Sequence, residues 1–195
     1  VDVTVTDGSA SDSTSFTLTV NPVNDAPVLD ALSDANTDED TDFVLTLSAS
    51  DVDGDDLTYF AQVDGSGSAL VDGTTLTVSP AADYNGPIVV TVTVSDGQVG
   101  NTDSFTLTVN AVNDAPVIAS ITDQAINEDT SLVLDLSADD VDGDALTFSA
   151  SSTDADVVVE GTSLTVTPAL DFNGTILVDV TVTDGSASDS TSFTL

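Results

Sequence analysis

The 195-residue chain is strongly acidic and carries no positive side chain to balance its charge. It contains 35 aspartate and glutamate residues, no lysine, arginine or histidine, and a formal net charge of −35 at pH 7. Nucleic acids and anionic membranes are held mainly by Lys and Arg, so this composition argues against both partners. Cysteine is also absent, which excludes disulfides, thiolate metal sites and cysteine nucleophiles.

The chain is nevertheless too apolar to be a disordered acidic tail, because 40% of its residues are hydrophobic. Repulsion among so many carboxylates opposes a compact state, so a folded chain must recruit cations from solution. No apolar run approaches the ~20 residues of a membrane span. No signal peptide is visible either.

The sequence repeats with a period of one domain. Asp25 and Glu39 recur 89 residues later as Asp114 and Glu128. This period suits a seven-stranded sandwich of about 100 residues, whereas solenoid units run about 20–50 residues. A joint of nearly constant sequence, at 21–28 and again at 110–117, ends each repeat in a proline that cannot extend a central strand.

The repeats divide the chain into three predicted parts. Residues 1–24 are the last two strands and linker of a truncated repeat, 25–113 form a complete repeat, and 114–195 form a nearly complete one. Residues 1–18 are identical to 178–195. Because two strands cannot bury an apolar face alone, we expect the true N-terminus of the parent protein to lie elsewhere.

The complete repeat predicts about seven strands in chain order, all with a period of two. Turn signals such as Asp53-Gly54, Asp72-Gly73 and Asn85-Gly86 separate them. Runs rich in Val and Thr without helical periodicity predict an all-β fold with two sheets packed face to face. The expected strands lie near 27–29, 43–47, 57–59, 69–71, 76–78, 88–94 and 105–109.

Three acidic motifs recur in each repeat. Glu39 opens the first, Glu39-Asp40-Thr41, and the second is the turn Asp51-Val52-Asp53-Gly54-Asp55. The third is the joint itself, with its asparagine and aspartate at Asn113 and Asp114. Carboxylate and amide oxygens are the ligands that Ca²⁺ prefers, and a glycine turn can direct several carboxylates at one ion. Taken alone, the Asp-x-Asp-Gly-Asp turn is also compatible with an ordinary surface turn.

The order of these motifs resembles a known family. Residues 48–59, with alternating aspartates leading into a glycine turn and an aromatic strand, are similar to the cadherin signature. The combination of Glu-Asp-Thr, Asp-Val-Asp-Gly-Asp, Asp-Tyr/Phe-Asn-Gly and Val-Asn-Asp-Ala-Pro-Val resembles the cadherin-like tandem repeats of large bacterial surface adhesins. The resemblance implies tandem immunoglobulin/cadherin-like, seven-stranded Greek-key sandwiches, exposed at the cell surface.

The resemblance also implies a calcium cluster at each joint. The expected ligands come from the end of one repeat, the linker, and the start of the next. At the 110–117 joint they are Glu39, Asp83, Asn113, Asp114, Asp140, Asp142 and Asp184. At the 21–28 joint they are Asn24, Asp25, Asp51, Asp53 and Asp96. Glu128 and Asp171 would serve a third joint beyond Leu195.

The linker departs from the animal cadherin pattern at two places. Asparagine stands at Asn21 and Asn110 where an aspartate is usual, and Ala26 and Ala115 replace a second asparagine. These changes bear on the number of bound ions and on affinity. Extracellular calcium modules bind at about 10⁻⁴–10⁻³ M.

Two functional hypotheses follow, and a third is disfavoured. The first is a calcium-rigidified extender or stalk of a bacterial adhesin, whose partners are calcium and the adjacent repeats. The second is the repeat unit of a self-associating extracellular filament made of identical chains. An enzyme is disfavoured because only carboxylates are available for catalysis. Scattered aspartates such as Asp12 and Asp154 are interpreted as solvated surface.

Overall fold

The computed structural model describes residues 1–195 and contains strands without any helix. It therefore has no helical segment with the length and apolarity to cross a bilayer. The chain divides into two compact units, Val1–Val109 and Asn110–Leu195. The predicted all-β fold is confirmed.

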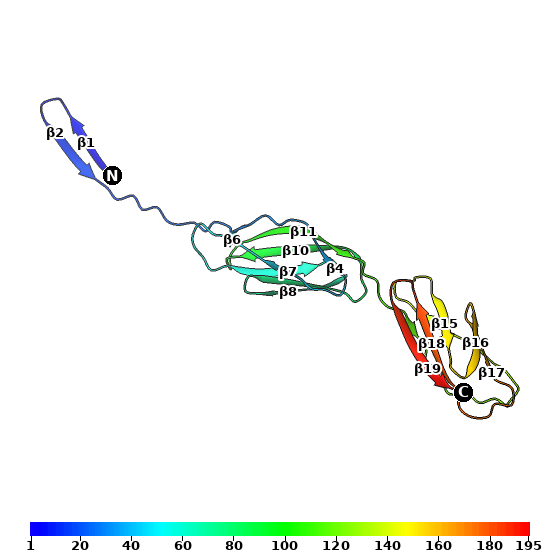
Figure 1. Ribbon diagram of the computed structural model, residues 1–195. Coiled ribbons are helices and arrows are strands. Elements are labelled where there is room, and N and C mark those ends of the chain that lie inside the picture. Colours follow the sequence, from blue (N-terminus) through cyan, green and yellow to red (C-terminus); the bar gives the residue numbers. More distant parts are fainter. The chain divides into compact units, whose positions relative to one another are not determined.

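The first unit contains the second repeat and the strands before it, labelled in Figure 1 where space allows. Its strands are β1 (Asp2–Thr6), β2 (Ser11–Ser15), β3 (Val28–Leu29), β4 (Ala35–Asp38), β5 (Phe43–Thr46), β6 (Ala49–Ser50), β7 (Thr58–Val63), β8 (Gly67–Asp72), β9 (Thr75–Pro80), β10 (Gly86–Ser95) and β11 (Gly100–Asn110).

Two sheets form the sandwich of the second repeat. One has the strand order β4-β11-β10-β7 and the other the order β5-β9-β8, while β3 and β6 pair separately. Figure 1 shows β7, β10 and β11 side by side. The longest ladder joins β10 to β11 over ten residue pairs, from Gly86–Val109 to Ser95–Gly100. Neighbours that are distant in sequence, such as β7 and β10, mark the crossovers of a Greek-key sandwich.

The core lies between these sheets and follows the period-two pattern. Val90, Val92 and Val94 on β10 are fully buried, while Thr91 and Thr93 between them face outward. Leu76 and Val78 on β9 supply the facing layer. Burying each such side chain stabilises the fold by roughly 1.5–3 kcal/mol. The regular alternation fixes the register, because a one-residue slip would turn the apolar face to solvent.

The third repeat forms the second unit. Its strands are β12 (Val117–Ile118), β13 (Leu132–Asp135), β14 (Ala138–Asp139), β15 (Thr147–Ser151), β16 (Ala155–Glu160), β17 (Ser163–Pro168), β18 (Leu177–Thr183) and β19 (Ser188–Thr194). They assemble as β13-β17-β16, β15-β18-β19 and the pair β12-β14. The core again joins a β17 layer, with Leu164 and Val166, to a β18 layer, with Val178 and Val180.

The second repeat has two short strands beyond those expected. β4 has the polar sequence Ala-Asn-Thr-Asp and gives no apolar alternation, so its strand character comes from pairing beside β11. β6 contains only two residues and pairs with β3. Such strands depend on a neighbour's backbone rather than on their own side chains, and sequence periodicity cannot reveal them.

Residues 1–22 are exposed throughout. Strands β1 and β2 form an isolated antiparallel hairpin that belongs to neither sheet of the sandwich. The division of the chain at 24/25 and 113/114 stays a prediction.

Candidate metal centres

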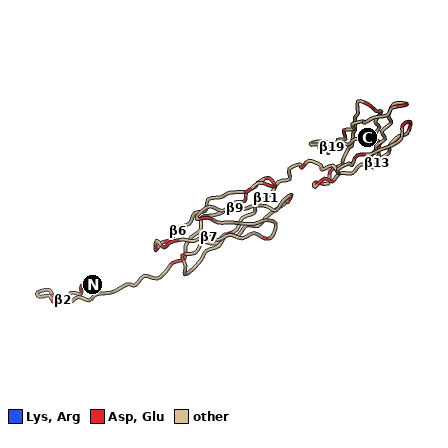
Figure 2. Tube along the Cα trace, turned by 90° about the horizontal axis from the view of Figure 1, so that it is seen from below, with Lys and Arg blue, Asp and Glu red and all other residues tan.

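Acidic side chains gather mainly in the turns of each unit rather than along the strands. Figure 2 shows the chain with its aspartates and glutamates in red and without a single basic residue. In each repeat, carboxylates collect at two places, which we call the entry cluster and the exit cluster.

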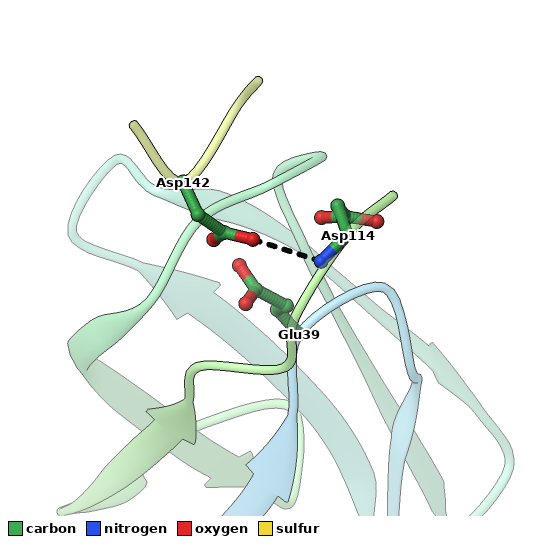
Figure 3. Close-up of side chains that lie close together, drawn as sticks. All are labelled: Glu39, Asp114 and Asp142. Atoms are coloured by element: carbon green, nitrogen blue, oxygen red, sulfur yellow. Dashed lines mark hydrogen bonds between the residues drawn. The ribbon is translucent and has the colours of Figure 1, made fainter. Parts of the chain in front are cut away.

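The entry cluster of the third repeat joins the linker to two turns. The backbone N–H of Asp114 donates to Asp142 Oδ2 over 2.8 Å, which is drawn as a dashed line in Figure 3. The side-chain amide of Asn113 donates to Asp184 Oδ2 over 2.9 Å. The cluster consists of Asn113, Asp114, Asp140, Asp142, Asp144 and Asp184.

The second repeat builds the same entry cluster from matching residues. The backbone N–H of Asp25 donates to Asp53 Oδ2 over 2.8 Å, and the side-chain amide of Asn24 donates to Asp96 Oδ2 over 2.8 Å. Gln98 adds a bond of its own, donating from Nε2 to Asn24 Oδ1. The cluster consists of Asn24, Asp25, Asp51, Asp53, Asp55 and Asp96. The structure thus brings together the residues that the sequence assigned to each repeat's start.

The Asp-x-Asp-Gly-Asp turn explains how three carboxylates converge. Asp51 Oδ1 accepts backbone N–H bonds from Asp53 and Gly54, and Gly54 adopts a φ of 79° that closes the turn. One carboxylate oxygen from each of Asp51, Asp53 and Asp55 lies within 4.8 Å of the other two.

The third repeat repeats this convergence. Oxygens of Asp140, Asp142 and Asp144 lie within the same 4.8 Å, and Gly143 has a φ of 77°. In both turns the first aspartate keeps one buried oxygen, Asp51 Oδ2 or Asp140 Oδ2, that has no hydrogen-bond partner. A buried carboxylate oxygen without a partner is costly, because it has lost its water and gained no donor. A hard cation fits such a site.

Two carboxylates in the second repeat's entry cluster have pKa values shifted in opposite directions. Desolvation, followed by the charges of Asp51 and Asp53, raises the pKa of Asp55 above its usual value. Asp96 has a lowered pKa, first because Asn24 donates to it and then because the backbone N–H groups of Val99 and Gln98 do. The chain itself supplies no cation to relieve the repulsion at Asp55.

The third repeat shows the lowered pKa at the matching position. The backbone N–H of Ala187 is the main cause for Asp184, followed by the side chain of Asn113 and the backbone N–H of Ser186. Asp184 therefore stays ionised well into the acidic range and is available as an oxygen ligand at neutral pH.

The exit cluster of the second repeat holds the other predicted ligands. Glu39 is the only charged residue that is buried, with 4% of its surface exposed, and Asn85 Nδ2 lies 3.5 Å from its Oε2. The backbone N–H of Asp83 donates to Asp40 Oδ1 over 3.2 Å. The cluster consists of Glu39, Asp40, Asp83 and Asn85.

The exit cluster of the third repeat is built from Glu128, Asp129 and Asp171. The backbone N–H of Asp171 donates to Asp129 Oδ1 over 2.9 Å, while Glu128 is exposed. Asp129 and Asp171 both adopt left-handed backbone conformations, as do Asp40 and Asp83 in the second repeat. These four are the only non-glycine residues with positive φ. Strained backbone of this kind collects at functional sites.

The aromatic residue of the Asp-Tyr/Phe-Asn-Gly motif anchors the exit cluster to the core. Tyr84 packs against the core and donates its hydroxyl to the carbonyl of Pro87. Gly86 has a φ of 138°, and a Cβ there would lie 2.9 Å from the Tyr84 hydroxyl. Phe172 and Gly174 repeat this approach in the third repeat at 3.2 Å. A glycine is therefore favoured at this position, because a side chain would be too close to the aromatic residue.

The length of strand β10 sets the distance between the two clusters of the second repeat. Asp83 precedes the ten-residue strand β10, and Asp96 follows it. At about 3.3 Å per residue, β10 holds them about 30 Å apart. The chain enters the repeat at one cluster and leaves, through β11, at the other.

Sequence reasoning missed some members of the clusters. Asp55 and Asp144 belong to the quoted turn motif but were not assigned as ligands, although their oxygens join the triads. Asp40 and Asp129 directly follow the expected glutamates, and their only signal was the Glu-Asp-Thr motif itself. Asp40 and Asp129 accept the backbone N–H groups of Asp83 and Asp171. These hydrogen bonds join residues more than forty positions apart in the sequence.

A family model for a bacterial Ig domain matches residues 24–110 and again residues 113–195. The chain belongs to the bacterial Ig domain family. Its two matched segments cover most of the sequence and correspond to two tandem domains.

The chain is similar in sequence to one known protein and in structure to another. The chain is 33% identical over 155 residues to chitinase A of Pseudoalteromonas piscicida, but it spans only 19% of that protein's length. It is also similar to a crystal structure of human protocadherin-24 EC1-2, with 19% identity, a TM-score of 0.53, and coverage of 87% of this chain and 98% of that one. The second likeness shows a cadherin-like fold.

Proposed function

We propose that this chain is a calcium-binding extracellular repeat module that acts as an extender or stalk in a bacterial cell-surface adhesin. The observation that carries calcium binding is the triad in each entry cluster, where three carboxylates converge and one buried oxygen has no partner. All available ligands are oxygens, the donor set of Ca²⁺. Membership of a bacterial Ig family and the cadherin-like fold support an extracellular location.

The extender role depends on sharing each ion between domains. At the 110–117 joint, the exit cluster of the second repeat (Glu39, Asp83) and the entry cluster of the third repeat would contribute ligands to common calcium ions. Without a cation, carboxylates that two repeats bring to one joint would repel each other, so the joint would swing. An ion bound only by the aligned state would stabilise that state. Glu128 and Asp171 would serve the next joint in the same way.

The test is a calcium titration of the full chain by calorimetry and small-angle X-ray scattering. We expect binding at about 10⁻⁴–10⁻³ M and a rise in maximum dimension over the same range. Asp142→Asn should weaken binding and abolish the change in dimension, whereas Asp154→Asn, a matched change outside both clusters, should leave both intact. A shape indifferent to calcium would contradict the extender role, and calcium-driven growth in mass would favour the filament.

A second candidate is a spacer in a secreted glycan-degrading enzyme. It is favoured by the 33% identity to part of a chitinase. The same calcium-stiffened repeats would then set the distance of a catalytic domain from another domain. The coding sequence on either side of this chain separates the candidates: a glycoside hydrolase domain supports the spacer, and a distal binding domain with a surface anchor supports the adhesin.

A further inference from the structure

The two entry clusters hold their linker asparagine with the same pair of donated hydrogen bonds. Asn24 Nδ2 donates to the carbonyl of Asp25 over 3.0 Å and to Asp96 Oδ2 over 2.8 Å. Asn113 Nδ2 makes the two matching bonds over 2.8 and 2.9 Å. Because an asparagine amide has two N–H donors, both are used in each repeat, and the amide has the same anchors in both.

The oxygen of the same amide distinguishes the two repeats. Gln98 Nε2 donates to Asn24 Oδ1 over 2.6 Å, whereas Asn113 Oδ1 accepts no hydrogen bond. The residue after the glycine of the turn makes the difference, because it is Gln98 in the second repeat and the much shorter Ser186 in the third. Exposure agrees with these contacts, since Asn24 is half-buried and Asn113 is exposed.

The oxygen is the part of an asparagine side chain that can bind a cation. Ca²⁺ takes amide and carboxylate oxygens as ligands, and an N–H group cannot serve. In the second repeat, the Gln98 N–H therefore competes with a cation for Asn24 Oδ1. Gln98 is not needed to orient the amide, because the two donated bonds hold it in both repeats. Its effect should be to make the oxygen less available.

We infer that Gln98 weakens calcium binding at the second repeat's entry cluster by occupying Asn24 Oδ1. This inference rests on the proposed calcium binding and adds a residue that sets affinity without being a ligand. The turn reads Asp-Gly-Ser at Ser9, Asp-Gly-Gln at Gln98 and Asp-Gly-Ser again at Ser186, so two turn types alternate. Joints of the two types should become ordered at different calcium concentrations, and an array of them should stiffen in steps as calcium rises.

The test follows calcium binding at each entry cluster separately in the full chain. In an NMR titration with calcium chloride, the backbone amide of Gly54 reports on the second repeat's turn and that of Gly143 on the third repeat's. Gln98→Ser should lower the calcium concentration at the Gly54 midpoint by about 2–10-fold, the range that corresponds to one neutral hydrogen bond. The Gly143 midpoint should stay where it is in the native chain.

Two further variants isolate the hydrogen bond. Gln98→Met keeps a side chain of similar length without an N–H donor, so it should lower the Gly54 midpoint as Gln98→Ser does. Ser186→Gln supplies the third repeat with the donor that it lacks, and it should raise the Gly143 midpoint by a similar factor. Each cluster is compared with itself across variants, which removes the other differences between the repeats.

The outcomes separate this inference from the proposed function. If Gly54 and Gly143 respond to calcium but the Gly54 midpoint is the same with Gln98, serine or methionine, the inference is wrong and calcium binding stands. A shift with serine but not with methionine would also overturn it, because side-chain size would then be the cause. If neither glycine responds to calcium, the proposed calcium binding itself fails, and this inference fails with it.

Discussion

The side-chain amides of Asn24 and Asn113 each orient one carboxylate of an entry cluster. Each donates to an aspartate that follows a long strand, Asp96 or Asp184, and to the backbone carbonyl of the next residue. A linker residue is thereby tied to a turn about seventy positions away. This bond orients the carboxylate and lowers its pKa.

Asn24→Ala should raise the pKa of Asp96 toward its ordinary value, because the amide is the largest cause of its lowering. A lowered pKa stabilises the fold above the unfolded value of 3.8, and this stability is lost as pH falls through the folded pKa. The variant should therefore gain less stability from Asp96 at neutral pH, and the remaining contribution should be lost completely at a higher pH than in the native chain. Carboxylate NMR titration measures the shift, with the exposed Asn36→Ala as control. An unchanged Asp96 titration would refute this assignment.

In both repeats, an aspartate outside the clusters accepts a backbone N–H group of the last strand. Asp34 Oδ1 accepts the backbone N–H of Thr106, and Asp123 Oδ1 accepts that of Thr194, each over 2.7 Å. The matching pairs occur at equivalent positions of the two repeats. Part of the acidic content therefore has a structural role as a hydrogen-bond acceptor.

Asp34→Ala should lower the free energy of unfolding of the second repeat by about 1–2 kcal/mol, because the Thr106 N–H loses its acceptor. Asp34→Asn retains an oxygen acceptor and should cost less. Denaturant unfolding measures both, and calorimetry should show calcium affinity unchanged. Equal losses for the two variants would mean that charge, rather than the hydrogen bond, sets the effect.

The elements that the sequence predicts well are those whose own side chains define them. β10 and β11 alternate apolar and polar residues, and burial follows that alternation. β4 could not be predicted because its pairing partner begins more than sixty residues later. The convergence of Asp51, Asp53 and Asp55 follows from a local turn, whereas the bond between Asp83 and Asp40 requires the folded sandwich.

Across the whole molecule, the uncompensated charge makes stability depend on the solvent's cations. All 35 acidic side chains repel one another without a single Lys or Arg to screen them. A generic salt would only screen this field. A divalent ion held by a triad would also bind the folded state selectively.

Calcium should therefore raise the melting temperature far more than sodium chloride at equal ionic strength. At 100 times Kd, one site contributes about 2.7 kcal/mol, or about 10–20 °C for a domain of this size. Differential scanning calorimetry measures the shift, and Asp51→Asn with Asp140→Asn should reduce it. Equal stabilisation by the two salts would show that the carboxylates act only through general screening.

The path of the chain through one repeat also has a mechanical meaning. The chain enters beside Asp96 and leaves at the far end of β11, which lies between β4 and β10. Tension on the two ends therefore acts along the strands. It loads the ten residue pairs between β10 and β11 together, in shear, instead of opening them one at a time. A repeat threaded in this way resists being pulled apart even when its net stability is modest.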